Sequence, residues 1–159
     1  MATGAFFNAL GYRFWVKIGT TASIAPTTST GMTEVLSLVN SGIQSKSDTT
    51  EVIDYGSPQG YKAAVVTGQS YSIPMEMNLD LRNPGYLILK EAARDAATGK
   101  TVEWYRESPE MTSAGNPEYH SGVAFVADLS EQIQAGQVAK ISFTLNGYGA
   151  PTWVAETDA

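Results

Sequence analysis

The residues that could carry out catalysis are few, and they form no recognisable set. The chain has one histidine, His120, and no cysteine. A Ser–His–Asp triad or an ordinary zinc site would have to be built around this histidine without a thiolate. His120 begins a candidate strand, where a structural or surface histidine is the better interpretation. Asp and Glu pairs occur by chance in such a chain, and the sequence singles out none for acid–base work.

Two further clusters resemble ligand sites only loosely. Asp48, Glu51 and Asp54 supply the oxygen ligands that calcium prefers, but they lack the glycine-containing spacing of a dedicated calcium loop. Gly147-Tyr148-Gly149 is not followed by the Lys-Ser/Thr pair of a phosphate loop, and it does not open a helix. We therefore expect no catalytic residue, no metal site and no cofactor.

The composition limits the class of protein. At 159 residues the chain fits one domain with a core of its own. The lack of cysteine excludes a disulfide scaffold. The net charge of −6 repels nucleic acid and anionic membranes over about a Debye length, ~8–10 Å. No apolar run is long enough for a membrane span, and the first residues lack the basic region of a signal peptide, so we expect neither membrane association nor signal-dependent secretion.

The clearest structural signal is the stretch from Tyr71 to Arg82, in which apolar and polar residues alternate. Such a period of two predicts a strand with one buried and one wet face. Burial contributes about 1.5–3 kcal/mol for each large side chain, as an upper estimate. The apolar residues are Tyr71, Ile73, Met75, Met77, Leu79 and Leu81. The other face carries Ser72, Pro74, Glu76, Asn78, Asp80 and Arg82.

Six other segments are predicted to be strands, although the period of Met32–Val39 does not separate strand from helix. Trp15 falls on the charged face of the first strand, which indicates either a contact with another element or subunit or an ordinary exposed aromatic. In the predicted strand Tyr119–Leu129, the side chains of Val123, Phe125, Ala127 and Leu129 are expected to face inward. The predicted strands are Tyr12–Ile18, Met32–Val39, Tyr61–Val66, Thr101–Glu107, Tyr119–Leu129 and Gln137–Asn146.

One helix is predicted. Asn83 is a suitable N-cap with Pro84 at the first helical position, the apolar residues that follow have helical spacing, and Gly99 is a suitable C-cap. The helix is expected over residues 84–97. The sequence thus predicts a single, mainly β domain over residues 1–159, with antiparallel strands and one flanking α-helix.

Several segments do not fit the core of that domain. Residues 1–11 form an arm whose Phe6 and Phe7 pack either on a neighbour or on their own core. Residues 41–60 read as an unusually long loop, residues 67–69 as a turn, residues 108–117 as a hairpin loop, and residues 154–159 as an acidic tail. Arms and long loops of this kind favour a subunit of an assembly.

The order of these elements resembles the major tail tube proteins of long-tailed, lambda-like bacteriophages. The order and spacing carry the resemblance, because no single piece is a specific motif. The pieces are Phe14–Gly19, Thr33–Val35, Asp48–Tyr55, Tyr71–Pro84 with the helix up to Lys100, and Val138–Trp153.

The resemblance implies a β-sandwich of two packed antiparallel sheets and a structural role in the virion. In that role, hexameric rings stack into a hollow tail tube, assembled in the host cytoplasm. Tape-measure protein and DNA pass through the tube, the DNA without specific binding, and terminator and tip proteins close its ends. A tube protein of a contractile tail or of a type VI-like secretion machine is an alternative. A carbohydrate-binding or adhesin β-sandwich that uses Trp15, Trp104, Tyr105 and Trp153 is a more distant one.

Applied to this chain, the resemblance suggests two sets of functional residues. Repeated acidic side chains such as Glu76 and Asp80 would give the bore a negative wall that does not hold DNA, diluted by Lys140. The candidates for the lumen are Ser72, Glu76, Asn78, Asp80, Lys140, Ser142 and Thr144. The candidates for contacts between subunits or rings are Phe6, Phe7, Trp15, Lys46, Asp48, Glu51, Asp54 and Tyr55.

Overall fold

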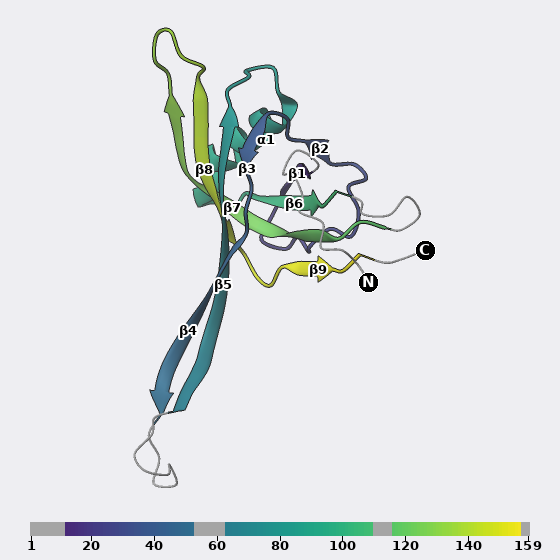
Figure 1. Ribbon diagram of the computed structural model, residues 1–159, viewed down its shortest axis with the longest axis vertical. Coiled ribbons are helices and arrows are strands. Elements are labelled where there is room, and N and C mark those ends of the chain that lie inside the picture. Colours follow the sequence, from purple (N-terminus) through teal and green to yellow (C-terminus); the bar gives the residue numbers. More distant parts are fainter. Residues whose placement is uncertain (1–11, 53–62, 110–115, 157–159) are drawn as a thin grey trace, which may run out of the picture.

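The computed structural model describes residues 12–52, 63–109 and 116–156 (Figure 1). Within these ranges one antiparallel sheet of nine strands carries one α-helix on its flank, as the sequence predicts. The strands are β1 Arg13–Gly19, β2 Thr33–Glu34, β3 Leu38–Asn40, β4 Gln44–Val52, β5 Ala63–Asn78, β6 Thr101–Glu107, β7 Tyr119–Gln132, β8 Lys140–Gly147 and β9 Thr152–Val154. The predicted arm 1–11 lies outside the described residues, as do parts of the predicted 41–60 loop, 108–117 loop and 154–159 tail.

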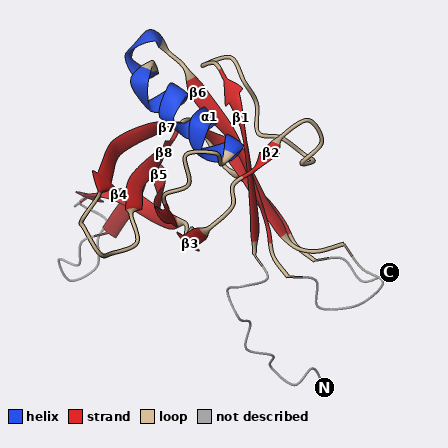
Figure 2. Cartoon of the chain, turned by 90° about the horizontal axis from the view of Figure 1, so that it is seen from above, coloured by secondary structure: helices blue, strands red, loops and turns tan. Residues whose placement is uncertain are grey.

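The sheet is continuous, but its two halves face one another like the layers of a sandwich. The strand order is β2-β1-β6-β7-β8-β5-β3, and the path is not closed over the described residues. Strand β7 belongs to both halves, because residues 119–124 pair with β6 and residues 124–132 pair with β8. The helix α1, Pro84–Arg94, lies where the two halves diverge (Figure 2).

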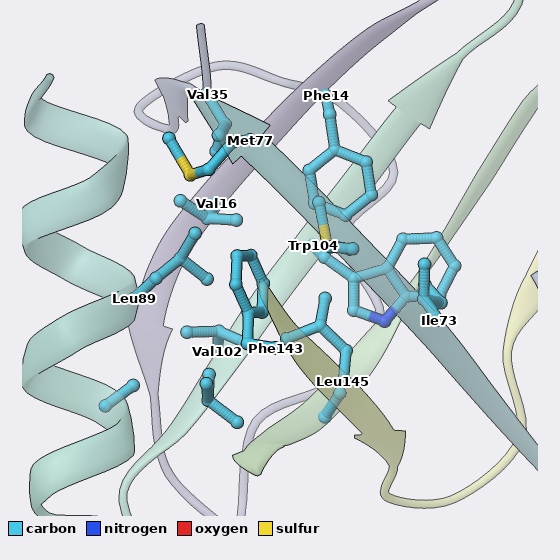
Figure 3. Close-up of a cluster of buried hydrophobic side chains, with 14 of the residues drawn as sticks. Phe14, Val16, Val35, Ile73, Met77, Leu89, Val102, Trp104, Phe143 and Leu145 are labelled. Carbon is cyan, nitrogen blue, oxygen red and sulfur yellow. The ribbon is translucent and has the colours of Figure 1, made fainter. Parts of the chain in front are cut away.

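Large side chains from both halves fill the space between them (Figure 3). Trp104 on β6 stacks on Phe14 of β1 and also meets the ring of Tyr71 on β5, a strand that is not its neighbour in the sheet. The alternation predicted from Tyr71 is confirmed as far as Met77, since Ile73, Met75 and Met77 are buried, but β5 ends at Asn78 and Leu81 is 67% exposed rather than buried. The helix adds Tyr86, Leu89 and Ala92 to the same core.

One hydrogen-bonded contact fixes the two halves of the sheet to each other. The Tyr71 hydroxyl donates to the carbonyl of Val123 at 2.8 Å and accepts from Trp104 Nε1 at 3.1 Å. Two glycines make room for this ring. A Cβ at Gly122 would lie 2.6 Å from the Tyr71 hydroxyl, and a Cβ at Gly147 would overlap the Tyr71 ring itself.

The segment predicted as a long loop is largely a strand. Residues 44–52 form β4, which pairs with β5 from Val52↔Ala63 to Gln44↔Ser72. The predicted turn at residues 67–69 is also wrong, because β5 runs unbroken through it. Both segments are rich in Ser, Thr, Gly and Gln. Every residue of β4 is exposed, so its sequence has no alternation of apolar and polar residues that would predict a strand. Pairing rather than burial therefore creates this hairpin, which protrudes from one end of the molecule (Figure 1).

Apolar residues occupy both sides of β1 and β7. Trp15 lies on the predicted face, opposite Phe14 and Val16, but it is only 8% exposed, since it packs edge-on against Tyr105 of another strand and under the guanidinium of Arg13. The predicted faces of Phe125 and Ala127 are wrong. On β7 the core receives Ala124 and Val126, so Phe125 and Ala127 point the other way. Residues 32–39 contain parts of β2 and β3 rather than one strand, and Trp153 lies in β9.

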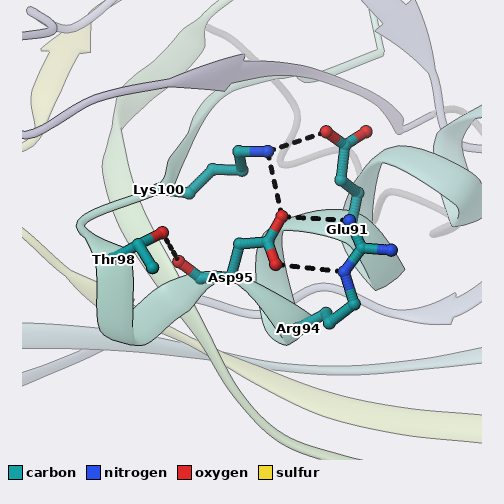
Figure 4. Close-up of polar contacts among 5 residues, drawn as sticks. All are labelled: Glu91, Arg94, Asp95, Thr98 and Lys100. Carbon is teal, nitrogen blue, oxygen red and sulfur yellow. Dashed lines mark hydrogen bonds and ion pairs between the residues drawn. The ribbon is translucent and has the colours of Figure 1, made fainter.

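The helix begins where its sequence predicts, but its α-helical part ends three residues before the predicted residue 97. The Asn83 side chain accepts from the backbone N–H of Gly85 at 3.0 Å, and Pro84 is the first helical residue. The α-helix ends at Arg94, and a short 3-10 helix, η3 (Ala96–Thr98), leads to Gly99 at φ 87°. Arg94 and Lys100 both bind the carboxylate of Asp95 (Figure 4), and these bonds hold the pKa of Asp95 well below its usual value.

Gly147→Ala should destabilise the fold, because the added methyl group overlaps the buried ring of Tyr71. Overpacking of this kind costs about 1–3 kcal/mol. Gly42→Ala is the matched control, since a Cβ there meets nothing nearer than the Asn40 side chain at 3.7 Å. Urea unfolding of both variants measures the difference. Equal midpoints for the two variants would show that Tyr71 can move aside without cost.

Candidate assembly surfaces

The half of the sheet made by β4, β5, β8 and the end of β7 has one face turned to solvent. Pairing places polar residues of β5 beside polar residues of β8, for instance Glu76 beside Ser142 and Asn78 beside Lys140. The structure therefore brings together six of the seven predicted lumen residues on one face. They are Ser72, Glu76, Asn78, Lys140, Ser142 and Thr144.

This face is close to neutral, which differs from the predicted acidic wall. Lys140 Nζ lies 3.1 Å from Glu76 Oε1, so the two charges compensate each other. Asp80 is not on the face, because β5 ends at Asn78 and the Asp80 carboxylate instead accepts from the backbone N–H of Arg82. Serine and threonine hydroxyls with asparagine amides make up most of the remainder. The alternation in the sequence could identify the residues of this polar face, but it could not reveal that Glu76 of β5 and Lys140 of β8 form an ion pair that neutralises it.

The β4–β5 hairpin carries the predicted contact residues Lys46, Asp48 and Glu51 away from the core. Lys46 and Asp48 form an exposed ion pair at 3.6 Å, which contributes little to stability. The pairing register shifts between Asp48 and Thr49, opposite Gly68. Such a bulge bends a hairpin and increases its twist.

The same half of the sheet has open strand edges. Beyond Ala124, the edge of β7 on the β6 side has no strand partner among the described residues. A groove lies along this edge, lined by Leu87, Lys90 and Leu129 among others. The outer edge of β4 and the β8 side of residues 63–71 are likewise unpaired within the described ranges. Unpaired edges are templates for pairing with another chain.

His120 lies in a small polar cluster rather than a catalytic one. Its Nδ1 is 3.3 Å from Arg106 Nη2 and 3.8 Å from Glu118 Oε1, and its ring is 6.5 Å from that of Trp153 on β9. Glu118 also accepts from Trp153 Nε1 at 2.9 Å. Burial, and then the charge of Arg106, lower the pKa of His120, so the neutral imidazole fits the fold best. The cluster joins β9 to β7.

Other ligand sites considered from the sequence find no support. Over residues 12–52, 63–109 and 116–156, no three acidic or histidine side chains gather to hold a metal ion. Trp15, Trp104 and Tyr105 are buried, which leaves Trp153 as the exposed member of the predicted aromatic set and argues against a carbohydrate platform. No helix in the described part of the chain is long and apolar enough to cross a bilayer.

Of the remaining predicted contact residues, Phe6, Phe7, Asp54 and Tyr55 lie outside the described residues. Trp15 is inside the subunit and leaves little surface for a neighbour. The sequence does not indicate which strand edges lack a strand partner, because residue types do not reveal how strands pair.

No protein-family model and no curated protein sequence matches the chain significantly, but solved structures do. The tail of an empty gene transfer agent particle, refined with C6 symmetry, superposes with a TM-score of 0.68 at 14% identity, covering 94% of this chain and 100% of that chain. The SPP1 tail tube gives 0.69 at 13% identity, covering 95% of this chain and 80% of that one. The chain has the tail tube fold. The anti-feeding prophage baseplate contains a chain with a TM-score of 0.67 at 15% identity, with 98% of both chains covered.

The lowered pKa of His120 predicts a loss of stability in mild acid. The unfolded chain takes up a proton near pH 6.5 while the folded chain resists it, so stability that is complete above this pH falls as the pH drops below it. His120→Gln should flatten the dependence between pH 7 and pH 5. Unfolding free energies of both proteins at the two pH values measure it. An equal loss in both would assign the effect to carboxylates instead.

Proposed function

We propose that this chain is the structural subunit of a phage tail tube, in which six copies close a ring and the rings stack into a hollow conduit. One observation carries the proposal. The tail tube fold extends over almost the whole chain, and it covers all of a subunit from a tail with C6 symmetry. No catalytic role is proposed.

The open strand edges support ring closure. The unpaired edge of β7 and the outer edge of β4 lie on opposite sides of the same half-sheet. A head-to-tail contact between different surfaces of identical subunits generates a ring when the rotation closes. If the β7 edge of each subunit pairs with the β4 edge of the next around the ring, neither edge is left open to aggregation.

We place the neutral polar face toward the bore. DNA moves past a wall easily when that wall offers no unpaired cation to its phosphates, and here Lys140 is engaged by Glu76. Asp80, just beyond the end of β5, would lie at the rim of the bore. The tape-measure protein would occupy the bore before DNA, and terminator and tip proteins would close the ends of the tube. Assembly would take place in the host cytoplasm and the product would reside in the virion tail.

The protruding β4–β5 hairpin is proposed to bridge adjacent rings, with Lys46, Asp48 and Glu51 on it. Phe6, Phe7, Asp54 and Tyr55 stay predicted contacts. The likeness to the anti-feeding prophage chain supports a contractile machine as a second candidate. Both candidates use a tube, and a sheath protein encoded beside this chain would favour the second.

Purified protein should form hollow tubes with six-fold symmetry, visible by negative-stain electron microscopy. Replacing residues 47–69 by Asn-Gly should stop this without unfolding the subunit, because the replaced residues described in β4 and β5 lie outside the core. The two-residue turn closes the hairpin after Lys46↔Ser70. The thermal midpoint is the control for folding. Normal tubes from the shortened chain would refute the bridging role.

Glu76→Lys should make the bore adhesive to DNA, because it reverses a charge on the proposed wall and frees Lys140. Tubes should still assemble, since Glu76 is on the solvent face. Glu103→Lys makes the same charge change on β6, in the other half of the sheet, and is the matched control. Retention of short DNA duplexes by sedimented tubes at low and high salt measures the effect, which should weaken with salt. Equal retention by both variants would argue against the assigned face.

A further inference from the structure

Exposed large apolar side chains gather at the two opposite ends of β5. At the hairpin end Val52, Val65 and Val66 are 44%, 49% and 54% exposed, and we call them the valine end. At the other end Leu36, Leu81 and Leu87 are 53%, 67% and 53% exposed, and we call them the leucine patch. Single exposed apolar residues are ordinary, but groups of them mark contacts.

The leucine patch is held together by Asn83. The Asn83 side-chain amide donates to the carbonyl of Leu36 at 2.9 Å, and the backbone carbonyl of Asn83 accepts from the N–H of Leu87 at 3.2 Å. Asn83 N–H closes a turn onto the carbonyl of Asp80 at 3.0 Å, which places Leu81 in that turn. Three leucines from separate segments therefore surround one buried residue.

The valine end cannot cover the leucine patch of its own subunit. Strand β5 contains 16 residues, and the valines and the Asp80–Asn83 turn are at its two ends. At about 3.3 Å per residue, such a strand separates them by about 50 Å. Figure 1 shows the hairpin pointing away from the loop that joins β5 to α1.

We infer that the valine end of one copy covers the leucine patch of a second copy, in the ring stacked next to it. This inference rests on the proposed function and names the residues that join the rings. The composition of the hairpin changes at its bulge. Gln, Ser, Lys and Asp precede it in β4, and the described residues beyond it are Thr, Ala and Val with Glu51 as the one charged side chain. The outer half therefore has more apolar surface to remove from water, and head-to-tail stacking brings opposite ends of two copies together. Side-by-side pairing of two hairpins through their open edges is the competing arrangement.

Cross-linking in assembled tubes distinguishes these arrangements, because the chain has no cysteine of its own. Val66→Cys is combined in turn with Leu36→Cys, Leu81→Cys and Leu87→Cys, and tubes are treated with a short bis-maleimide. At least one pair should give a ladder of covalent oligomers. Val66→Cys with Ile24→Cys is the control, since Ile24 is 80% exposed but outside the patch. Dimers from Val66→Cys alone would favour side-by-side hairpins, and no ladder from any pair would overturn the inference.

A second measurement uses assembly itself. Leu36→Asp with Leu81→Asp should lower tube yield at least about tenfold, the effect of a loss of 1.4 kcal/mol at a contact. The subunit should keep its thermal midpoint, because both side chains are exposed, and Ile24→Asp should assemble normally. Tubes of normal yield would refute the inference and leave the proposed function intact. Failure of the unaltered protein to form any ring or tube would instead refute the proposed function.

Discussion

The contact of Tyr71 with Trp104 and Val123 is the constraint on which the rest of the structure depends. It joins strands that are not neighbours in the sheet, and it sets how the two halves of a continuous sheet meet. It is buried, so each donor and acceptor must be satisfied, and the loss of one partner leaves another unpaired at a cost of about 1–3 kcal/mol. Gly122 and Gly147 are required beside it because neither position can hold a Cβ.

Tyr71 also marks the boundary between two parts of β5 that are stabilised in different ways. From Tyr71 to Met77 alternate side chains are buried, and the core stabilises the strand. From Ala63 to Ser70 no residue is buried, and pairing with β4 is its main support. Two-stranded ribbons are marginally stable alone in water. The exposed valines of this ribbon would gain stability from a neighbour that covers them. The direction of the ribbon is fixed because β5 continues without a break into the core.

The candidate site was predictable in its residues but not in its charge. Alternation along β5 and β8 assigned Ser72, Glu76, Ser142 and Thr144 to one type of face, and the structure places them on one surface. The pairing of Glu76 with Lys140 depends on the register between two strands separated by more than sixty residues of chain. No local pattern specifies that register. For this reason the face predicted to be acidic is close to neutral in the structure. Asp80 is not part of the face because the chain turns after Asn78.

Elements whose signals are local could be predicted from the sequence alone. The helix cap at Asn83, the alternation after Tyr71 and the strand over residues 101–107 need only short-range sterics, capping and burial. The burial of Trp15, the orientation of Phe125 and the existence of β4 depend on contacts between segments that are far apart in the chain. Tyr105 on β6 covers Trp15. Phe125 lies on a strand with apolar residues on both faces, so period alone cannot choose its side. Strand β4 is exposed throughout and exists because β5, which follows it after ten intervening residues, supplies its hydrogen bonds.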